Sequence, residues 1–263
     1  MELGMGGRTA LVGGASRGLG LAVSERLAEE GMNVIMVSRG AERLQRESER
    51  IASRYGIVTL PIAADLSLDK GIQHILDVAT DQFDAIDVLF HNTGGPPPGL
   101  FVDLDDEAWT KAYEGILLSV VRLCRGVLPG MQTKGWGRIL INTSFTVKEP
   151  APRLILSNVF RTGVVALAKT LSREVASDGV TVNCICPGAF DTERLASIFE
   201  EQATRSGRSP SDVRKAWIAD IPQGRILEPR ELGDLVAFLA SDRARGITGS
   251  CIPMDGGMLH GLF

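Results

Sequence analysis

Residues 9–20 read Thr-Ala-Leu-Val-Gly-Gly-Ala-Ser-Arg-Gly-Leu-Gly, a short apolar run that passes through a glycine-rich turn into a helical pattern. The apolar run predicts a buried strand, and the glycines let the following backbone turn tightly. A helix that begins here has free N–H groups and a positive dipole end, which together suit a phosphate. Glycine-rich turns also serve close packing alone, so both interpretations stay open for this segment.

Short apolar runs alternate with longer amphipathic stretches along the rest of the chain. Most runs are continuously apolar, as in parallel strands covered on both faces. This alternation predicts right-handed βαβ crossovers and an α/β fold: an open, doubly wound parallel sheet of about seven strands with helices on both faces. The predicted strands are residues 9–13, 33–38, 58–63, 87–91, 138–143, 181–186 and 250–254. The predicted helices include residues 19–30, 41–54, 70–83, 107–131 and 159–176.

Residues 190–219 break the alternation. They are polar, charged and helical in pattern, yet they lie between the last two predicted strands. A long insertion near the carboxyl end of a sheet is more often a lid or substrate-binding segment than a linker. With no repeat, low-complexity segment or interdomain linker elsewhere, residues 1–263 are expected to form a single domain that carries 190–219 as a lid.

Charged groups at the end of the second predicted strand indicate which nucleotide the site prefers. A site selective for NAD usually has a carboxylate there for the ribose 2′-hydroxyl, but this chain has Ser38-Arg39. The planar fork of Arg39 can bind a 2′-phosphate, and Arg17 in the glycine-rich turn can close on the same group. Each arginine alone could equally be a solvated surface residue, but together they favour NADP.

Two further loops follow predicted strands. Asp65 comes after the third strand, where a carboxylate could accept from an adenine amino group, and Asn92-Thr93-Gly94-Gly95 follows the fourth. Both could instead cap a helix or close an Asx-turn. Because the carboxyl ends of parallel strands meet at one edge of a sheet, where ligands bind in such folds, we expect these loops to lie together.

The composition is that of an ordinary globular chain, with 44% hydrophobic and 23% charged residues in 263. A net charge of −4 argues against a nucleic-acid partner, and no apolar run approaches the ~20 residues of a membrane span. The cysteines, Cys124, Cys184, Cys186 and Cys251, are too scattered for a disulfide scaffold or a zinc site. Cys184 and Cys186 are expected to face one side of a strand and to pack. We therefore expect a cytoplasmic protein with no metal and no membrane contact.

Six spaced segments resemble, in order, the short-chain dehydrogenase/reductase family over essentially the whole chain. The pattern Gly14-x3-Gly18-x-Gly20 looks like the family's cofactor loop. Asn92-x-Gly94 looks like its Asn-Asn-Ala-Gly segment, and the residues from Pro187-Gly188 to Thr192 look like its nicotinamide-contacting turn. Residues 182–183 and 247–257 resemble its carboxyl-terminal pattern, and the nearest look-alikes are the 3-oxoacyl-carrier-protein reductases.

The resemblance implies a Rossmann fold, an NADP(H) cofactor and an oxidoreductase that acts on a small-molecule or carrier-linked carbonyl or alcohol substrate. It also implies a homotetramer or homodimer packed through the two long helices at 107–131 and 159–176. The cofactor contacts that it implies, together with those argued above, are Gly14, Ser16, Arg17, Gly18, Leu19, Gly20, Ser38, Arg39, Asp65, Leu66, Asn92, Gly94, Pro187, Gly188 and Thr192.

The family's catalytic set is a serine, a tyrosine, a lysine and an asparagine, of which this chain retains only the serine, as Ser144. The tyrosine and lysine positions hold Ser157 and Arg161, and the asparagine position holds Ile116. A phenol with a pKa near 10 can be tuned toward neutrality by a cation, but a serine hydroxyl is a far weaker acid. We therefore predict that Ser144, Ser157 and Arg161 polarise a carbonyl while water supplies the proton.

Several alternatives stay open. The altered set also fits a catalytically silent nucleotide-binding homologue that acts as a sensor or partner subunit. Tyr113 and His91 could replace the missing proton donor, or could be ordinary core residues. The cations of the lid could bind an anionic carrier or could form a solvated helical face. These cations are Arg194, Arg205, Arg208, Arg214 and Lys215.

Overall fold

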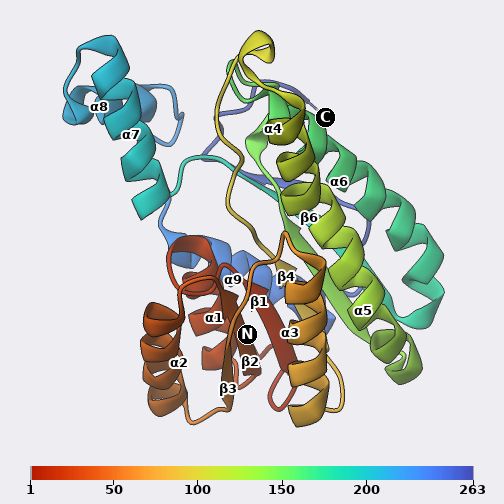
Figure 1. The fold of residues 1–263 in the computed structure, drawn as a ribbon. Helices are drawn as coiled ribbons and strands as arrows, with labels where there is room; N and C mark the ends of the chain where they lie inside the picture. The colour runs from red at the N-terminus through yellow and green to blue at the C-terminus, as the bar shows by residue number, and fades with distance from the viewer. Residues whose placement is uncertain (1, 263) are drawn as a thin grey trace.

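The computed structural model describes residues 2–262, and its centre is a seven-stranded parallel sheet in the order β3-β2-β1-β4-β5-β6-β7 (Figure 1). Each predicted strand is present, with ends within one residue of the prediction, so the doubly wound α/β fold is confirmed. The strands are β1 (Thr9–Gly13), β2 (Asn33–Ser38), β3 (Thr59–Ala63), β4 (Val88–His91), β5 (Gly137–Asn142), β6 (Val180–Pro187) and β7 (Cys251–Met254).

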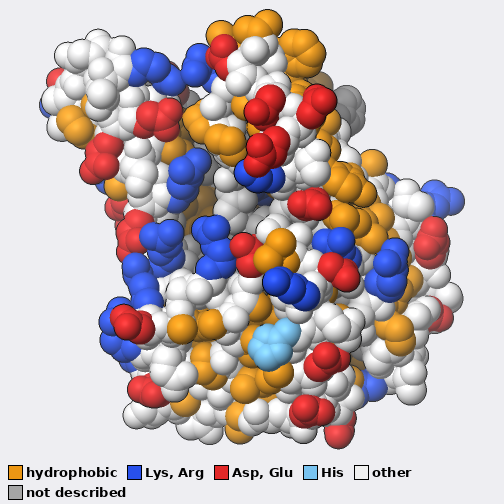
Figure 2. Space-filling model, viewed as in Figure 1, with side chains coloured by type: hydrophobic (Ala, Val, Ile, Leu, Met, Phe, Trp, Pro, Cys, Tyr) orange, Lys and Arg blue, Asp and Glu red, His pale blue; other side chains and the backbone are white. Residues whose placement is uncertain are grey.

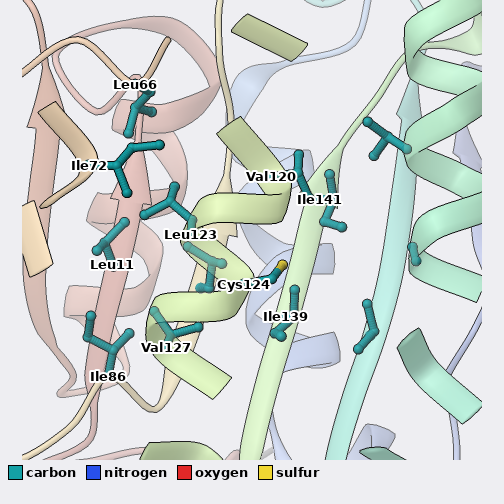
Figure 3. Close-up of a cluster of buried hydrophobic side chains, with 14 of the residues drawn as sticks. Leu11, Leu66, Ile72, Ile86, Val120, Leu123, Cys124, Val127, Ile139 and Ile141 are labelled. Carbon is teal, nitrogen blue, oxygen red and sulfur yellow. The ribbon is translucent and has the colours of Figure 1, made fainter. Parts of the chain in front are cut away.

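Helices cover both faces of the sheet because neighbouring strand residues point to opposite sides. Val12 of β1 lies in the cluster beneath α1 (Gly18–Glu29), α2 (Ala41–Tyr55) and α9 (Pro229–Ala240). Leu11 lies in the cluster on the other face, beneath α3 (Asp69–Gln82), α5 (Ser119–Lys134) and α6 (Ile155–Val175). Figure 3 shows this second cluster, with Leu123 and Val127 of α5 over the strands. Both layers hold the carboxyl ends of the strands in fixed positions.

The predicted helix at 107–131 is wrong as a single unbroken helix. It consists of α4 (Asp106–Ala112), a π-helical turn η2 (Tyr113–Leu118) and α5. The Ser119 hydroxyl donates to the carbonyl of Gly115 at 2.8 Å, and serine bonding to the preceding turn bends helices. Turns of this kind often occur beside functional sites. Here the turn carries the buried Ile116.

Residues 190–219 form two helices, α7 (Glu193–Ser206) and α8 (Pro210–Ala219), which stand away from the sheet at the upper left of Figure 1. They have a small apolar cluster of their own, in which the rings of Phe199 and Trp217 lie 5.7 Å apart. Short 3₁₀ turns complete the chain: η1 (Phe101–Asp103), η3 (Phe145–Val147), η4 (Ala176–Asp178) and η5 (Asp242–Ala244). Among the described residues, no helix is both long and apolar enough to cross a membrane.

Candidate active site

The sheet order reverses at β1, which pairs with β2 on one side and β4 on the other. Loops that leave neighbouring strands toward opposite faces open a crevice at the carboxyl edge, where ligands bind in doubly wound sheets. The Asn92 side chain spans this point, since its Nδ2 donates to the carbonyl of Gly13 at 3.2 Å. The surface is hollowed between the α7–α8 segment and the body, and Lys and Arg side chains line the hollow (Figure 2).

The glycine-rich turn has the backbone that its sequence predicts. Gly14 and Gly18 have φ angles of +64° and +55°, a region that favours glycine. A Cβ on Gly14 would lie 2.6 Å from Asn92 Nδ2, and one on Gly20 would collide with the Gly14 carbonyl. Helix α1 starts at Gly18, so the backbone from Ser16 to Gly20 presents the unpaired N–H groups of a helix start to the crevice.

Three arginines gather beside this turn. Arg17 lies 2.9 Å and Arg43 lies 2.7 Å from the carboxylate of Glu193, the first residue of α7. The hydrogen bond from Arg43, and then that from Arg17, holds the pKa of Glu193 below its usual value. Arg39 is exposed at the end of β2 and has no ion-pair partner within residues 2–262. Arg43 was not predicted from the sequence, although its position four residues after Arg39, in the first turn of a helix, was a usable signal.

The loops after β3 and β4 differ in what they offer. Asp65 Oδ1 accepts from the Ser67 backbone N–H at 2.9 Å and from its hydroxyl at 2.8 Å, so this carboxylate closes a turn. Leu66 is buried, and a Cβ on Gly13 would lie 3.0 Å from it. A Cβ on Gly94 would meet no described atom within 4 Å, so the chain there borders open space.

The turn after β6 completes this edge. Gly188 N–H donates to the Met254 carbonyl at 2.9 Å, and Thr192 caps α7 by accepting from Leu195 N–H at 3.3 Å. A Cβ on Gly18 would lie 3.4 Å from the Thr192 side chain. The glycine-rich turn and the turn that begins at Pro187, far apart in sequence, therefore lie side by side.

The two predicted catalytic serines are brought together by a third hydroxyl residue. Ser144 follows β5, and its Oγ accepts from the Thr146 backbone N–H at 3.2 Å. The Thr146 hydroxyl lies 3.4 Å from the hydroxyl of Ser157, which is 7% exposed on the first turn of α6. Thr146 was not predicted as a site residue, because nothing in its spacing distinguishes it from other threonines.

Arg161 lies against the end of β5. Its Nη1 donates to the carbonyls of Asn142, at 3.1 Å, and Thr143, at 2.9 Å. Burial lowers the pKa of Arg161 to about 10, which leaves it charged at neutral pH. The guanidinium thus fixes the strand end that carries Ser144. The Asn142 amide continues the network, because it donates to Asn92 Oδ1 at 2.9 Å.

His91 is buried at the end of β4, in a small recess that Arg161 and Ile116 also line. Its Nε2 lies 2.9 Å from the Ser119 hydroxyl, whose proton is directed at the Gly115 carbonyl. His91 must therefore donate from Nε2, which leaves Nδ1 as an acceptor with no partner among residues 2–262. Burial, aided by the charge of Arg161, lowers the pKa of His91 to about 3. A neutral imidazole of this kind is a weak proton donor.

The lowered pKa of His91 predicts acid sensitivity. Between pH 6.5 and 3 the unfolded chain binds a proton at this residue and the folded chain does not, so stability falls as the pH falls. The free energy of unfolding should drop by about 1.4 kcal/mol per pH unit from this group alone. Urea unfolding from pH 7 to 5 should show a shallower decline for His91→Gln than for wild type. The matched control is His74→Gln, on the exposed face of α3; equal slopes for all three proteins would refute the assignment.

Tyr113 was expected to be either a core residue or a spare acid. It is neither buried nor among the residues that line the recess at Arg161: it is 41% exposed and packs against Phe160 with ring centroids 6.2 Å apart. The expectation of a core tyrosine is therefore wrong. Tyr113 is the first residue of the π turn, whose buried side chain is that of Ile116.

Most cations of the lid have acidic neighbours. Arg205 lies 3.9 Å from Glu201, Arg214 lies 3.6 Å from Asp191, and Lys215 lies 3.8 Å from Asp212. These pairs are solvent-exposed and weak, but they balance the charge locally. These ion pairs favour the interpretation of the lid as a solvated helical surface and argue against a binding surface for an anionic carrier.

Comparison with known proteins settles the ancestry. The sequence family described as enoyl-(acyl carrier protein) reductase matches residues 14–259. The chain is a short-chain dehydrogenase/reductase. The family resemblance of the sequence motifs is thereby confirmed.

Members of this family cover the chain almost completely. The 3-oxoacyl-(acyl-carrier-protein) reductase of Vibrio cholerae is 34% identical over 252 residues, which are 96% of this chain and 97% of that protein. The corresponding reductase of Escherichia coli is 32% identical over the same length, with the same shares of both chains. The crystal structure of L-sorbose reductase from Gluconobacter frateurii, complexed with NADPH and L-sorbose, has a TM-score of 0.95 at 31% identity and covers 100% of both chains.

Proposed function

We propose that this protein is an NADPH-dependent reductase that converts a carbonyl group into an alcohol with an altered set of hydroxyl and guanidinium groups. The observation that carries the proposal is the row of hydroxyls formed by Ser144, Thr146 and Ser157. This row lies at the carboxyl edge of the sheet, beside the loops that suit a dinucleotide. The reductases among its family relatives support the same reaction class.

The residues at this edge fit NADP(H). Gly14 and Gly18 leave room for a pyrophosphate beside the start of α1, where backbone N–H groups are unpaired. Arg39 has no ion-pair partner among the described residues, and Arg17 and Arg43 both reach Glu193 on the same edge of the sheet. Three guanidinium groups suit a 2′-phosphate, whereas a ribose 2′-hydroxyl needs only one acceptor. The NADPH complex of the sorbose reductase supports this choice.

The bound cofactor supplies the hydride, and the protein positions and polarises the acceptor. Ser144 donates a hydrogen bond to the carbonyl oxygen and keeps its proton, because its own oxygen is already fixed as an acceptor by the Thr146 N–H. Ser157 provides the second hydroxyl. Arg161 is a positioning residue that holds the end of β5 and keeps a positive charge nearby. A tuned proton donor contributes about 10²–10⁴-fold, so protonation by water predicts slow turnover.

Installation of the family's tyrosine and lysine tests this function. We expect the double variant Ser157→Tyr/Arg161→Lys to lower the steady-state rate of NADPH oxidation with a ketone substrate. The lysine ammonium cannot reproduce the planar geometry of the Arg161 guanidinium. The tyrosine ring is too large for the position of Ser157, which is only 7% exposed. The rate is measured with a panel of ketones and aldehydes, beside wild type. Activity that arises only in the double variant would support the catalytically silent homologue instead.

The Glu193 carboxylate occupies two of the arginines that are proposed to bind the 2′-phosphate of NADPH. Because its carboxylate pairs with both Arg17 and Arg43, we expect Glu193→Gln to bind NADPH about two- to fivefold more tightly. Fluorescence titration at low salt gives the affinity. Glu201→Gln is the matched control and should leave the affinity unchanged, because Glu201 lies on the same helix and pairs with Arg205 alone among residues 2–262. Weaker binding by Glu193→Gln would mean that the carboxylate holds the arginines in place for the cofactor.

We also propose that residues 190–219 act as a lid within a single domain. Helices α7 and α8 pack on each other through Phe199 and Trp217, and they contact the nucleotide edge through Glu193. The balanced charges of the lid favour a small uncharged carbonyl over an anionic carrier. L-sorbose, with which the sorbose reductase was crystallised, is a compound of that kind.

The outer helices support the proposal of a homo-oligomer. Tyr113 and Val159 are 41% and 47% exposed on η2 and α6, the two elements that the family resemblance assigns to the subunit interface. Large apolar side chains on neighbouring helices gain free energy when a second copy covers them.

A further inference from the structure

Two of the four cysteines meet beside the proposed active site. Cys186 lies near the end of β6, and Cys251 lies at the start of β7. Their Sγ atoms are 2.9 Å apart, so one thiol donates a hydrogen bond to the other. The strands are parallel, with Cys184 opposite Cys251, so all three sulfurs share one face of the sheet. Among the described cysteines, only the pair between Cys186 and Cys251 makes a sulfur–sulfur hydrogen bond.

The surroundings stabilise negative charge on this pair. The Thr143 hydroxyl lies 3.3 Å from Cys186 Sγ. The hydrogen bond from Cys251 lowers the pKa of Cys186 most, and Thr143 and the charges of Lys148 and Arg161 act in the same direction. Thiolates, and not thiols, react with oxidants. The pair thus has the electrostatic environment that a reactive thiol needs.

The other two cysteines differ. Cys124 lies on the buried face of α5, and burial raises its pKa to about 12. Burial also raises the pKa of Cys184 to about 12, and it packs in the apolar cluster on the α6 face. Neither gains a hydrogen bond or a cation that lowers its pKa. They serve as internal controls within the same chain.

We propose that Cys186 and Cys251 form a redox-active dithiol that hydrogen peroxide closes into a disulfide. Cys251 is partly exposed and stays protonated, because its hydrogen bond to Cys186 raises its pKa, so after one proton leaves the charge of the pair lies on Cys186. The Cys186 thiolate attacks a peroxide oxygen, the O–O bond breaks, and the departing hydroxide takes a proton to become water. The Cys251 sulfur then attacks the resulting Cys186 sulfenic acid, the S–O bond breaks, and a second water leaves. The two thiols together lose two electrons and two protons, and the peroxide is reduced to two waters.

The disulfide would form one residue before the turn at Pro187-Gly188. That turn is tied to β7 by the bond from Gly188 N–H to the Met254 carbonyl, so a covalent link between the strands acts on it directly. Oxidation also changes the sulfur that faces Thr143, next to Ser144. We therefore expect the oxidised protein to bind NADPH more weakly, a consequence that rests on the proposed function.

Peptide mapping tests the dithiol without any nucleotide. The protein is treated with hydrogen peroxide, alkylated under denaturing conditions and digested without reductant. We expect one cross-linked peptide pair that joins Cys186 to Cys251, with Cys124 and Cys184 alkylated. The cross-link should vanish in Cys186→Ser and in Cys251→Ser and should persist in Cys184→Ser. A link between Cys184 and Cys251, or four alkylated thiols after peroxide, would overturn the proposal.

A second readout compares NADPH affinity before and after oxidation. Weaker binding that dithiothreitol reverses in wild type, and that is absent in Cys251→Ser, is the expected result. Equal affinity of the two forms would overturn the link between the dithiol and the site. Failure of the reduced protein to bind NADPH at all would refute the proposed cofactor. The peptide map would still show whether Cys186 and Cys251 form a disulfide.

Discussion

Replacement of Ser144 by alanine is expected to lower the turnover of NADPH with a carbonyl substrate by about 10²–10³-fold, the usual cost of losing one donor to a developing oxyanion. The Ser144 oxygen is anchored by the Thr146 N–H at 3.2 Å, so its proton is directed away from the backbone. Ser157 cannot take its place, because its hydroxyl lies on α6 and is engaged with Thr146 at 3.4 Å. The measurement is kcat from NADPH absorbance, with NADPH affinity determined in parallel.

Two control variants separate chemistry from folding. Ser144→Thr keeps a hydroxyl and should recover part of the lost rate, whereas Ser53→Ala, on the exposed face of α2, should leave it unchanged. NADPH affinity should be the same in Ser144→Ala and wild type, because Ser144 is not among the predicted cofactor contacts. A kcat for Ser144→Ala within a few-fold of wild type would remove this serine from the reaction.

Replacement of Arg39 by alanine is expected to raise the Kd for NADPH roughly 10–100-fold and to leave the Kd for NADH unchanged. Hydrogen bonds to a charged group contribute about 1.5–3 kcal/mol, and NADH lacks the phosphate that would accept them. Arg39 should matter more than Arg17 or Arg43, because those two already share the carboxylate of Glu193. Isothermal titration at fixed ionic strength provides both constants.

A charge-reversed variant sharpens this test. Arg39→Asp places a carboxylate where a ribose 2′-hydroxyl can donate to it, so its preference should invert toward NADH. Arg46→Ala, another exposed arginine on the neighbouring helix α2, is the matched control. Equal loss of NADPH and NADH affinity in Arg39→Ala would show that the residue supports the fold of the loop and does not read the phosphate.

The fold was predictable because buried parallel strands appear in the sequence as short, continuous apolar runs. Runs such as residues 33–38 are almost entirely apolar, since both faces are covered, and glycines mark the turns that follow. The glycine-rich turn was also predictable, because its positive φ angles favour glycine and its close backbone contacts leave no room for a Cβ at Gly14 or Gly20.

The sequence did not reveal which polar groups meet in the folded chain. The Ser119 hydroxyl, directly after the π turn, donates to the Gly115 carbonyl and also contacts His91 on another element. For Asp65 the sequence left open a contact to an adenine and an Asx-turn, and the structure shows its Oδ1 bonded to Ser67 in a turn. The pairing of Glu193 with Arg17 and Arg43 joins three elements that no local pattern connects. Periodicity reports burial, but it does not report which polar groups meet.

Direct observation of hydride transfer tests the proposed reductase most sharply. NADPH that carries deuterium on the transferred position of its nicotinamide is incubated with the protein and a panel of ketones and aldehydes, and the products are analysed by mass spectrometry. The proposed function predicts an alcohol with one deuterium on the former carbonyl carbon, formed by wild type and strongly reduced with Ser144→Ala. Tight NADPH binding without labelled alcohol from any member of the panel would contradict it and would leave a nucleotide-binding protein without reductase chemistry.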